Sequence, residues 1–478
     1  MSIPGLSIPG LNLTSNPLLS DLAPAAPTSR TQNLAPNTEY RFETSFDSAP
    51  VTIKVLTGTA ELFGTELAPA IAYTFNGTKA AIYTWQGCSL EITGEVEAEY
   101  VAEETPMIQY ANVHFALENM RHEGPGPRVL VVGQENCGKS SLVKMLTAYA
   151  VKSGRQNVAV NLDPRQGMLS VPGSLTAATM GSMLDVEEGW GSSPISGPTS
   201  MPVKMPLVYH FGCATAEENP RLWKSLVTRL GLAVKSRAEE DEAVRQGGVL
   251  IDTPGSIAKG GSYDLIQHVI SEFDVNVLLV LGSERLFNEL KKKVNESTTT
   301  VVRLDKSGGC VDRDESYMQQ LRQTQIREYF FGYGNINLAP HSMLADYAHL
   351  SIYRILASSA SSTAPAAATT TNDDEDDDFY EPSATISMPT STSTSSGPTL
   401  EKVSPTNMMQ NSLLAVTFAS PNASLEQIKD SAVMGYVYVA EVDEVKRKVK
   451  LLSPVGGAAP RNAMVWGSWP ESVVSLVS

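Results

Sequence analysis

One stretch of the chain places glycines, a lysine and a serine at fixed spacing directly after an apolar run. The run is Val129-Leu130-Val131-Val132, and it is followed by Gly133-Gln134-Glu135-Asn136-Cys137-Gly138-Lys139-Ser140-Ser141. This matches G-x-x-x-x-G-K-[ST], in which the glycines let successive backbone N–H groups face phosphate oxygens. A lysine at this position bridges β- and γ-phosphates, and the serine hydroxyl suits Mg²⁺, which prefers oxygen ligands. The stretch therefore predicts a site for a nucleoside triphosphate and its magnesium ion.

The residues expected to hold the nucleotide within this stretch are Gly133, Asn136, Cys137, Gly138, Lys139, Ser140 and Ser141. The apolar run is typical of a buried strand, and Leu142, Leu146 and Tyr149 follow at helical spacing. Strand, loop and helix in this order place the loop at a helix N-terminus, where partial positive charge favours phosphate. A strand-to-helix turn that carries these residues by chance is the alternative.

Two aspartates stand where a parallel sheet would present them to the nucleotide. Asp163 follows the apolar run 158–162, and Asp252 follows the run 249–251. The carboxyl ends of parallel strands line the ligand site in such sheets. Ser140, Asp163 and Asp252 are therefore the expected metal ligands, directly or through water, and Asp163 could also activate an acceptor hydroxyl. An aspartate that caps the following turn is the alternative for each.

The residues after Asp252 bear on the choice of nucleotide. Asp252-Thr253-Pro254-Gly255 fits the D-x-x-G of GTPase-like switches, so a nucleotide-hydrolysing switch is a rival interpretation. Guanine recognition would need [NT]-K-x-D after a late strand. The sequence offers only Lys306-Ser307-Gly308-Gly309 there, without the aspartate. ATP is therefore the expected nucleotide.

Two arginines, Arg322 and Arg327, lie on a predicted helix after the last strand of the predicted sheet. Arginines in such a position can close over a triphosphate as a lid and stabilise charge that develops on the γ-phosphoryl group. A solvated helix face is the alternative for either arginine, and residues five apart do not share a helix face perfectly.

Residues 125–340 alternate predicted strands and helices. The strands are near-continuous apolar runs, which is typical of a mostly parallel sheet covered by helices on both faces. The predicted strands after the first are Val158–Asp163, Pro206–Phe211, Gly248–Asp252, Val275–Leu281 and Thr300–Leu304, and the predicted helices are Glu218–Leu230, Tyr263–Phe273, Glu284–Lys293 and Met318–Phe330. This region is the expected ATP-binding domain of an α/β protein.

Shorter β-like segments lie on both sides of this region. Residues 36–124 contain runs rich in β-branched and aromatic residues, with Asn76-Gly77 as a hairpin signal between Tyr73–Phe75 and Ala81–Trp85. They predict a small N-terminal β-sandwich or barrel, and the sandwich is the favoured interpretation. Residues 341–478 are expected to form a small C-terminal β-containing domain, with strands at Leu413–Phe418, Gly435–Ala440 and Lys448–Leu452.

Two segments have the composition of disordered chain. Residues 1–35 are rich in Pro and Ser, and residues 358–405 are rich in Ser, Thr, Ala and Pro around six consecutive acidic residues from Asp373 to Asp378. Such segments have too little apolar surface to offset the entropy of ordering. The acidic tract is interpreted as a solvated insertion, and a docking strip for a basic partner is the alternative.

Whole-chain composition limits the class of protein. With 52 Asp and Glu against 36 Lys and Arg, the net charge is −16. An acidic chain gains little from counterion release, so RNA or DNA would be held locally or through a partner. No apolar run approaches the roughly 18 residues of a membrane helix, and no signal peptide is evident, so a soluble intracellular protein is expected. The four cysteines form no C-x-x-C pair and indicate neither a zinc site nor a disulfide framework.

Six segments carry a resemblance to a known family: the phosphate loop, Asn161-Leu162-Asp163, the run 206–212, the run 283–290, Lys306-Ser307-Gly308-Gly309 and the run 325–330. Together they resemble the eukaryotic RNA 5′-hydroxyl polynucleotide kinase family. Within it, they are most similar to the fungal ATP-binding subunits of the pre-mRNA 3′-end cleavage and polyadenylation factor. The resemblance runs from about Glu39 to the C-terminus and is interrupted by the acidic tract.

The resemblance implies three parts, a β-sandwich, a central P-loop kinase-like domain and a C-terminal β domain. It also implies that the sandwich contributes ATP-binding residues near the adenine, matched here by Glu39 in Glu39-Tyr40-Arg41 and Lys79 in Thr78-Lys79-Ala80. The implied partners are the factor's polymerase-tail-binding subunit and its other subunits, with RNA met indirectly through the complex and no membrane. The implied location is the nucleus.

Two departures from active members of this family affect the acceptor side. In active members, the strand-end aspartate precedes a small residue and then Gly-Gln, whereas Pro164-Arg165 stands here. Active members also carry a tryptophan after the strand of the second aspartate, able to stack on the terminal base, and such stacking is worth about 1–3 kcal/mol. This chain has Pro254-Gly255-Ser256-Ile257 instead.

The sequence therefore favours an ATP-binding subunit of the cleavage and polyadenylation machinery that keeps ATP and Mg²⁺ as structural ligands, with kinase activity absent or weak. The alternative is an active ATP-dependent RNA 5′-hydroxyl kinase. In that case Lys139, Asp163, Arg322 and Arg327 would be its catalytic residues.

Overall fold

The computed structural model describes residues 28–192, 205–259, 262–334, 336–356, 399–474 and 476. The chain divides into two compact units. Unit 1 comprises Met1–Ala60 and Leu67–Glu103, and unit 2 comprises Glu61–Glu66 and Glu104–Ser478. None of the helices in the described ranges is long and apolar enough to cross a membrane.

Unit 1 is a β-sandwich. One sheet has the order β1-β8-β3-β6, and the other contains β7, β2 and β9 in this order. The strands are β1 (Ser29–Leu34), β2 (Thr38–Glu43), β3 (Val51–Gly58), β6 (Ala72–Phe75), β7 (Lys79–Thr84), β8 (Cys88–Thr93) and β9 (Ala98–Ala102). Alternate residues of β3 are buried, as in a sheet with one face on a core. Phe42 of β2 and Phe75 of β6 pack edge to face with centroids 5.2 Å apart, so the two sheets share that core.

Two expectations for this region are wrong. Strand β1 lies within the segment 1–35 that composition assigns to disorder, and it pairs antiparallel with β8 along its whole length. Local composition misses it because the partner strand is distant in the sequence. Asn76-Gly77 is not a hairpin turn, since β6 pairs with β3 while β7 pairs with β2. Gly77, at φ +56°, carries the chain from one sheet to the other. Residues 1–27 lie outside the described ranges.

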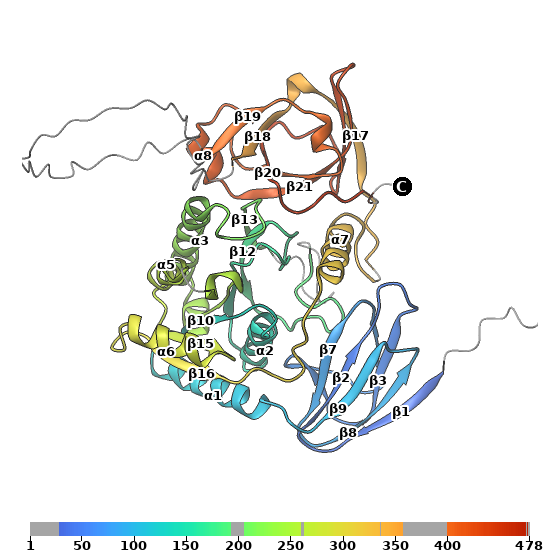
Figure 1. The fold of residues 1–478 in the computed structure, drawn as a ribbon, viewed down its shortest axis with the longest axis vertical. Helices are drawn as coiled ribbons and strands as arrows, with labels where there is room; N and C mark the ends of the chain where they lie inside the picture. Colours follow the sequence, from blue (N-terminus) through green and yellow to red (C-terminus); the bar gives the residue numbers. More distant parts are fainter. Residues whose placement is uncertain are drawn as a thin grey trace, which may run out of the picture. The chain divides into compact units, whose positions relative to one another are not determined.

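Unit 2 is built on a mixed sheet of order β13-β12-β11-β14-β10-β15-β16 (Figure 1). The strands are β10 (Arg128–Gly133), β11 (Asn157–Asn161), β12 (Ser174–Met180), β13 (Leu207–His210), β14 (Val249–Asp252), β15 (Val277–Leu281) and β16 (Thr300–Leu304). The neighbouring pairs β11–β14, β14–β10, β10–β15 and β15–β16 are parallel. Strand β12 runs antiparallel to both of its neighbours, β11 and β13. The predicted α/β class is confirmed. Strand β12 was not predicted because its polar and small residues do not form an apolar run.

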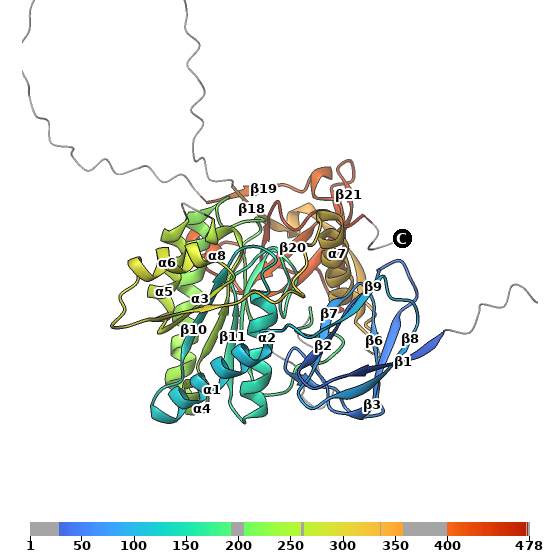
Figure 2. The ribbon, with the colours of Figure 1, turned by 60° about the horizontal axis from the view of Figure 1, so that its bottom comes forward.

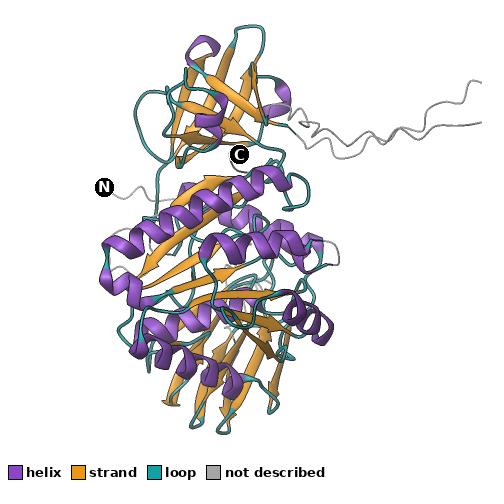
Figure 3. Ribbon diagram, turned by 90° about the vertical axis from the view of Figure 1, so that its left-hand side faces the viewer, coloured by secondary structure: helices purple, strands orange, loops and turns teal. Residues whose placement is uncertain are grey.

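Helices lie on both faces of this sheet. The helices of this part of unit 2 are α1 (Met107–Glu123), α2 (Lys139–Lys152), α3 (Pro220–Glu240), α4 (Glu242–Gly247), α5 (Tyr263–Phe273), α6 (Glu284–Lys293) and α7 (Glu315–Phe331). Helices α3 and α5 lie side by side on one face, where Trp223 and Ile266 share a core with Leu130 and Val160 (Figure 3). Helix α2 packs on the strands from the other face, and α1 packs on α2 (Figure 2).

Helix α1 lies in the segment 36–124 that was predicted as the β-sandwich domain, and the structure groups this helix with unit 2. Its buried residues include Met107, Tyr110, Ala111 and His114, which recur at helical spacing. The Tyr110 hydroxyl donates to the Asp305 carbonyl at 2.6 Å. The helix therefore belongs to unit 2, and the sandwich ends before residue 104.

A short hairpin from the N-terminal part of the chain also belongs to unit 2. It consists of β4 (Glu61–Leu62) and β5 (Thr65–Glu66), and it contacts α2. Glu61 accepts a hydrogen bond from the Tyr149 hydroxyl, and Glu66 pairs with Lys152 at 2.8 Å. A Cβ on Gly64, at φ +82°, would lie 2.9 Å from the Met145 carbonyl oxygen, so the turn is tight against the helix.

The C-terminal region forms a second sheet in unit 2, of order β17-β22-β21-β20-β23-β18-β19. Its elements are β17 (His341–Asp346), β18 (Ser351–Ile355), β19 (Leu400–Val403), β20 (Leu413–Thr417), α8 (Leu425–Lys429), β21 (Val433–Asp443), β22 (Lys448–Ser453) and β23 (Ala463–Trp466). The Tyr436 N–H donates to the Tyr329 hydroxyl at 2.9 Å, and Phe330 and Tyr438 pack in the same core. This shared core joins the two sheets.

Strand β19 corrects the expected disorder of residues 358–405. It pairs with β18, with Ile355 opposite Leu400. As with β1, the pairing partner lies outside the local window that gives the composition. Residues 357–398, including the acidic run, lie outside the described ranges.

Candidate nucleotide-binding site

The phosphate loop connects β10 to α2 in unit 2, as the sequence predicts. Gly138 is the last residue before the helix and has φ +93°, and Asn136 has φ +54°. These left-handed conformations turn the chain sharply between the strand and the helix. Helix α2 begins at Lys139, so the amides of its first turn lack partner carbonyls within the helix. They are available to an anion.

At both glycines of the loop, neighbouring atoms leave no room for a side chain. A Cβ on Gly133 would lie 2.6 Å from the Cys137 sulfur, and a Cβ on Gly138 would lie 2.6 Å from the Cys310 sulfur. Cys137 is itself buried, and burial raises the pKa of its thiol. Cys137 therefore packs inside the turn, with its thiol protonated at neutral pH.

Lys139 is buried beside the loop. Its ammonium group donates to the Gln134 carbonyl at 2.8 Å, so the side chain folds back over the turn that it follows. This position brings the charge to the centre of the loop. Ser141, also in the first turn of α2, is half-buried.

Ser140 and Asp252 form the candidate metal site. The Ser140 hydroxyl donates to Asp252 Oδ2 at 2.5 Å, and the Thr253 N–H donates to Asp252 Oδ1 at 2.9 Å. A hydroxyl and a carboxylate in contact provide the hard oxygen donors that Mg²⁺ prefers. The donor set fits the ion that the phosphate loop implies.

Burial changes the protonation of both aspartates. Burial raises the pKa of Asp252 to about 6, while Lys139 and the Ser140 hydrogen bond act in the opposite direction. Burial also raises the pKa of Asp163, opposed by the Arg165 N–H, Lys139, Arg165 and Arg313. With a pKa of about 6, the Asp252 carboxyl can exchange its proton for a metal ion at slightly acidic to neutral pH.

Asp163 is the first residue of a hydrogen-bonded loop on the acceptor side of the site, which we call the acceptor loop and define as residues 163–167. Asn161 accepts from the Asp163 N–H at 2.9 Å and donates to the carbonyls of Asp163 and Gln166. The Arg165 N–H donates to Asp163 Oδ1 at 3.0 Å. Gln325 of α7 exchanges two hydrogen bonds with the backbone of Gly167. This acceptor loop is fixed at both ends.

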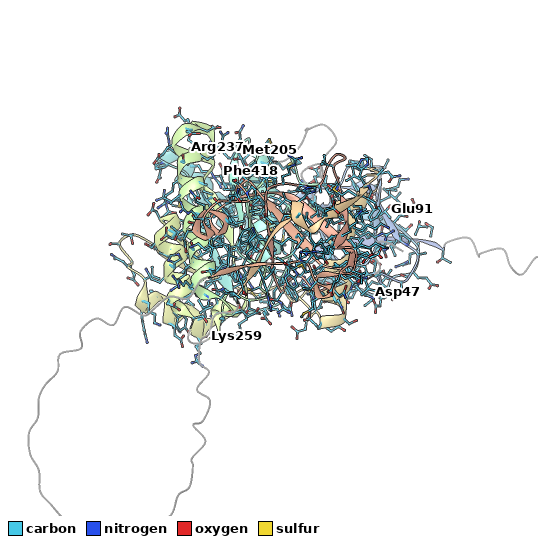
Figure 4. All side chains as sticks on the ribbon, turned by 90° about the horizontal axis from the view of Figure 1, so that it is seen from above. Asp47, Glu91, Met205, Arg237, Lys259 and Phe418 are labelled. Carbon is cyan, nitrogen blue, oxygen red and sulfur yellow. The ribbon has the colours of Figure 1, made fainter. Side chains whose placement is uncertain are left out.

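The side chain of Arg165 crosses from the acceptor loop to two carboxylates. It lies 3.7 Å from Glu135 of the phosphate loop and 2.9 Å from Glu315 at the start of α7. Glu135 also pairs with Lys259 at 3.3 Å. The Lys259 side chain is exposed (Figure 4). Arg165 therefore connects three elements around the site.

The two arginines predicted to form a lid are engaged elsewhere. Arg322 is 2% exposed, and its guanidinium pairs with Glu315 at 2.7 Å and Glu471 at 2.8 Å. It also stacks on the Trp469 ring at 4.5 Å. Arg327 is exposed and lies over the ring of Phe331. These contacts do not support the expected lid.

The arginine that the structure brings to the phosphate loop is Arg313, which is not among the residues predicted for the site. Its Nε donates to Asn136 Oδ1 at 3.3 Å, and its Nη1 donates to Gln166 Oε1 at 3.4 Å. A signal was present, since Arg313 stands between the glycine turn at Gly308-Gly309 and the N-cap Asp314 of α7. An arginine in that connection can reach the carboxyl edge of the sheet.

Glu39 and Lys79 lie in unit 1. Glu39 is buried and accepts two hydrogen bonds from Arg41, each at 3.2 Å. Lys79 pairs with Glu43 at 2.6 Å. Both side chains thus have charge partners within the sandwich, and their role toward adenine stays a prediction.

The loop geometry, the helix start and the Ser140–Asp252 contact define a P-loop nucleotide-binding protein flanked by a β-sandwich and a C-terminal β region. Three family profiles match this arrangement. They describe an N-terminal beta-sandwich domain of polyadenylation factor (residues 33–124), the P-loop of mRNA cleavage and polyadenylation factor CLP1 (residues 133–332) and pre-mRNA cleavage complex II protein Clp1 (residues 338–471). The chain belongs to the CLP1 family of mRNA cleavage and polyadenylation factors.

Curated relatives agree over the full length. The mRNA cleavage and polyadenylation factor CLP1 of Phaeosphaeria nodorum is 53% identical over 99% of this chain and 100% of its own length. The corresponding protein of Botryotinia fuckeliana is 47% identical with the same coverage.

Two solved structures are similar in fold. One is a wild-type Clp1p–Pcf11p complex, with a TM-score of 0.78 and 28% identity over 92% of this chain and 98% of that chain. The other is described as showing an extended interface between Pcf11p and Clp1p and the basis of ATP loss in a glycine-to-arginine point mutant. It has a TM-score of 0.80 with the same identity and coverage.

Proposed function

We propose that this chain is the ATP-binding subunit of a nuclear pre-mRNA 3′-end cleavage and polyadenylation complex, and that it keeps ATP and Mg²⁺ as structural ligands. Membership of the CLP1 family supports the complex, and the phosphate loop supports the nucleotide. The ATP loss described for a mutant of a solved relative supports ATP as that nucleotide. A ligand that binds only the folded state stabilises it by mass action.

The phosphate side of the site suits tight binding. The N-terminal amides of α2 and the ammonium group of Lys139 would hold the phosphates, and Ser140 with Asp252 would hold Mg²⁺, directly or through water. Magnesium supplies charge neutralisation between the phosphate oxygens. Arg313, through Asn136, keeps the loop in its turned conformation.

The observation that carries the non-catalytic interpretation is the position of Arg165. Its side chain bridges Glu135 and Glu315 next to Asp163, the residue that would activate an acceptor hydroxyl. An RNA 5′ end that approached Asp163 would have to displace this arginine from two carboxylates. Retention of ATP is therefore favoured over transfer of its phosphoryl group.

An active RNA 5′-hydroxyl kinase is the second candidate, and one observation favours it. The pKa of Asp163 is raised by burial, which brings this carboxylate closer to the value that a general base needs at neutral pH. In this case Lys139 would stabilise the transferred charge, and Arg165 would swing away when RNA binds.

Nucleotide analysis tests the proposal directly. Protein purified without added ATP is denatured and its nucleotide content measured, and a second sample is incubated with γ-labelled ATP and a 5′-hydroxyl oligoribonucleotide. We expect close to one ATP per chain and no label transfer. Efficient transfer would establish the kinase, and free ATP consumed over many turnovers would establish a hydrolysing switch. A chain that is empty and does not bind added ATP would overturn the nucleotide role.

The partner is proposed from the solved relatives. Both are Clp1p structures with Pcf11p, so we propose that this chain binds the corresponding polymerase-tail-binding subunit of its own complex. Co-purification of the two proteins tests this. The expected result is a stable complex that survives gel filtration, and separate elution would contradict it.

A further inference from the structure

The C-terminal segment 467–471 lies against the acceptor loop. The Trp469 indole N–H donates to the Pro164 carbonyl at 3.2 Å, and the Gly173 N–H donates to the same carbonyl at 2.8 Å. The Trp469 backbone N–H donates to the Gly212 carbonyl at 3.1 Å. The end of the chain is thus attached to the residue that follows Asp163.

A continuous chain of ion pairs leads from this segment to the phosphate loop. We call it the charge chain; its members are Glu471, Arg322, Glu315, Arg165 and Glu135. The successive N–O distances are 2.8, 2.7, 2.9 and 3.7 Å. It connects the C-terminal segment, α7, the acceptor loop and the phosphate loop, which are four separate parts of the sequence.

The links of the charge chain differ in strength because they differ in burial. Arg322 is 2% exposed and Glu471 24% exposed, and Arg322 also stacks on the Trp469 ring. Loss of one partner from such a pair leaves a poorly solvated charge, which is costly. Glu315 is 65% exposed, so its pairs are weakened by solvent and salt. The Glu471–Arg322 contact therefore anchors the rest.

We propose that segment 469–471 is a latch on the nucleotide site. Glu471 and Trp469 hold Arg322, which keeps Glu315 in place for Arg165, and Arg165 holds the acceptor loop against Glu135 of the phosphate loop. Glu471 and Trp469 are positioning residues, since they act through Arg322 and Pro164. This inference rests on the proposed retention of ATP, and it adds that the C-terminus slows release of the nucleotide.

The latch differs in its consequences from a simple structural contact. If Glu471 only stabilised the fold, restoring stability by other means would restore slow nucleotide release. If Glu471 acts through the charge chain, slow nucleotide release requires the ion pairs of the charge chain to be intact. Replacing a buried ion pair by uncharged groups is often neutral or stabilising, whereas removing one partner is strongly destabilising. This contrast separates the two roles.

The experiment measures release of a fluorescent ATP analogue from the full chain after addition of excess unlabelled ATP. The variants are Glu471→Gln and the double variant Arg322→Met/Glu471→Gln, with thermal unfolding followed in parallel. Glu426→Gln is the matched control, because it removes a glutamate of the same region from a surface ion pair with Lys429 of α8. Release is measured at low and high salt.

We expect Glu471→Gln to release the analogue about tenfold faster, within the roughly 5- to 150-fold range of coupling between sites. The double variant should recover the thermal midpoint but not the slow release. Release from the unmodified chain should be faster at high salt, and both variants should lose this dependence. The control should change nothing.

Unchanged release in Glu471→Gln, or slow release that returns with the thermal midpoint in the double variant, would overturn the latch while leaving the proposed function intact. An unmodified chain that binds no analogue at all would remove the proposed function as well. The two failures are therefore distinguishable.

Discussion

The two sides of the nucleotide site are built from different parts of the chain. The phosphate side comes from one contiguous stretch, Gly133–Ser141, joined by Asp252 from the neighbouring strand. The acceptor side combines the loop after β11 with α7 and the C-terminal segment, through contacts between residues far apart in sequence. Because the phosphate side depends mainly on the backbone conformation of one loop, it can be retained when a few side-chain substitutions change the acceptor side.

This comparison predicts that the phosphate side dominates affinity. Lys139→Ala removes the charge that would contact two phosphate groups. With hydrogen bonds to charged groups worth about 1.5–3 kcal/mol each, ATP affinity should fall about 100-fold. Calorimetric titration with ATP and Mg²⁺ measures it. The thermal midpoint without nucleotide should change little, because in the protein the ammonium group donates to the Gln134 carbonyl, which can bond to water instead. An unchanged ATP affinity in Lys139→Ala would contradict the prediction that the phosphate side dominates binding.

The metal site should give the phosphate side a pH dependence. Since burial raises the pKa of Asp252 to about 6, a proton competes with Mg²⁺ below that value. Affinity for ATP in Mg²⁺ should be constant above about pH 7 and should fall about tenfold by pH 5. Asp252→Asn should give weaker binding that no longer changes over this range. Titrations from pH 5 to 8 measure both, and a variant that keeps the full pH dependence would place the titrating group elsewhere.

A steric change sharpens the comparison without altering charge. A Cβ on Gly255, in the turn after Asp252, would lie 2.6 Å from the Glu135 backbone nitrogen. Gly255→Ala should therefore displace the phosphate loop and weaken ATP about fivefold, a cost on the order of 1 kcal/mol. Gly124→Ala is the matched control, since its Cβ would meet no atom within 4 Å. Equal affinities in the two variants would show that the loop can shift freely.

The smallest effect is a change in thermal stability, and it is expected on the acceptor side, at Glu328 of α7. Burial and the nearby Glu188 raise its pKa to about 7. Because the folded chain holds this proton more tightly than the unfolded chain, the protonated Glu328 contributes stability that is fully present below the pKa of the unfolded chain. This stability is lost as the pH rises through about 7. Glu328→Gln should raise the thermal midpoint at pH 8 by on the order of 2 °C and leave it unchanged at pH 4. ATP affinity should not change, and a change would couple α7 to the phosphates directly.

Local sequence patterns were sufficient for much of the molecule. Helices α5 and α6 have the predicted bounds, Tyr263–Phe273 and Glu284–Lys293, because each has strong amphipathic spacing between clear end signals. The phosphate loop was equally evident, since its function depends on spacing within nine residues, Gly133–Ser141. Asp163 and Asp252 follow from the rule that such sheets bind ligands at the carboxyl ends of their strands.

What the sequence did not reveal depends on distant partners. Strands β1 and β19 form because β8 and β18 present open edges to them, which local composition cannot show. Arg322 has the sequence position of a lid arginine, but Glu471 and Trp469 decide where its guanidinium lies. Arg313 was missed because its partners, Asn136 and Gln166, come from two other loops.

The hairpin β4–β5 has a practical consequence for dissecting the molecule. Residues 61–66 sit between two stretches of the sandwich in the sequence, yet they contact the helix that carries the phosphate loop. A truncation that begins at residue 104 would remove the sandwich and also strip α2 of Glu61 and Glu66. Loss of nucleotide from such a fragment would then result from the missing contacts of Glu61 and Glu66 with α2. The same loss could be mistaken for evidence that the sandwich itself binds the base.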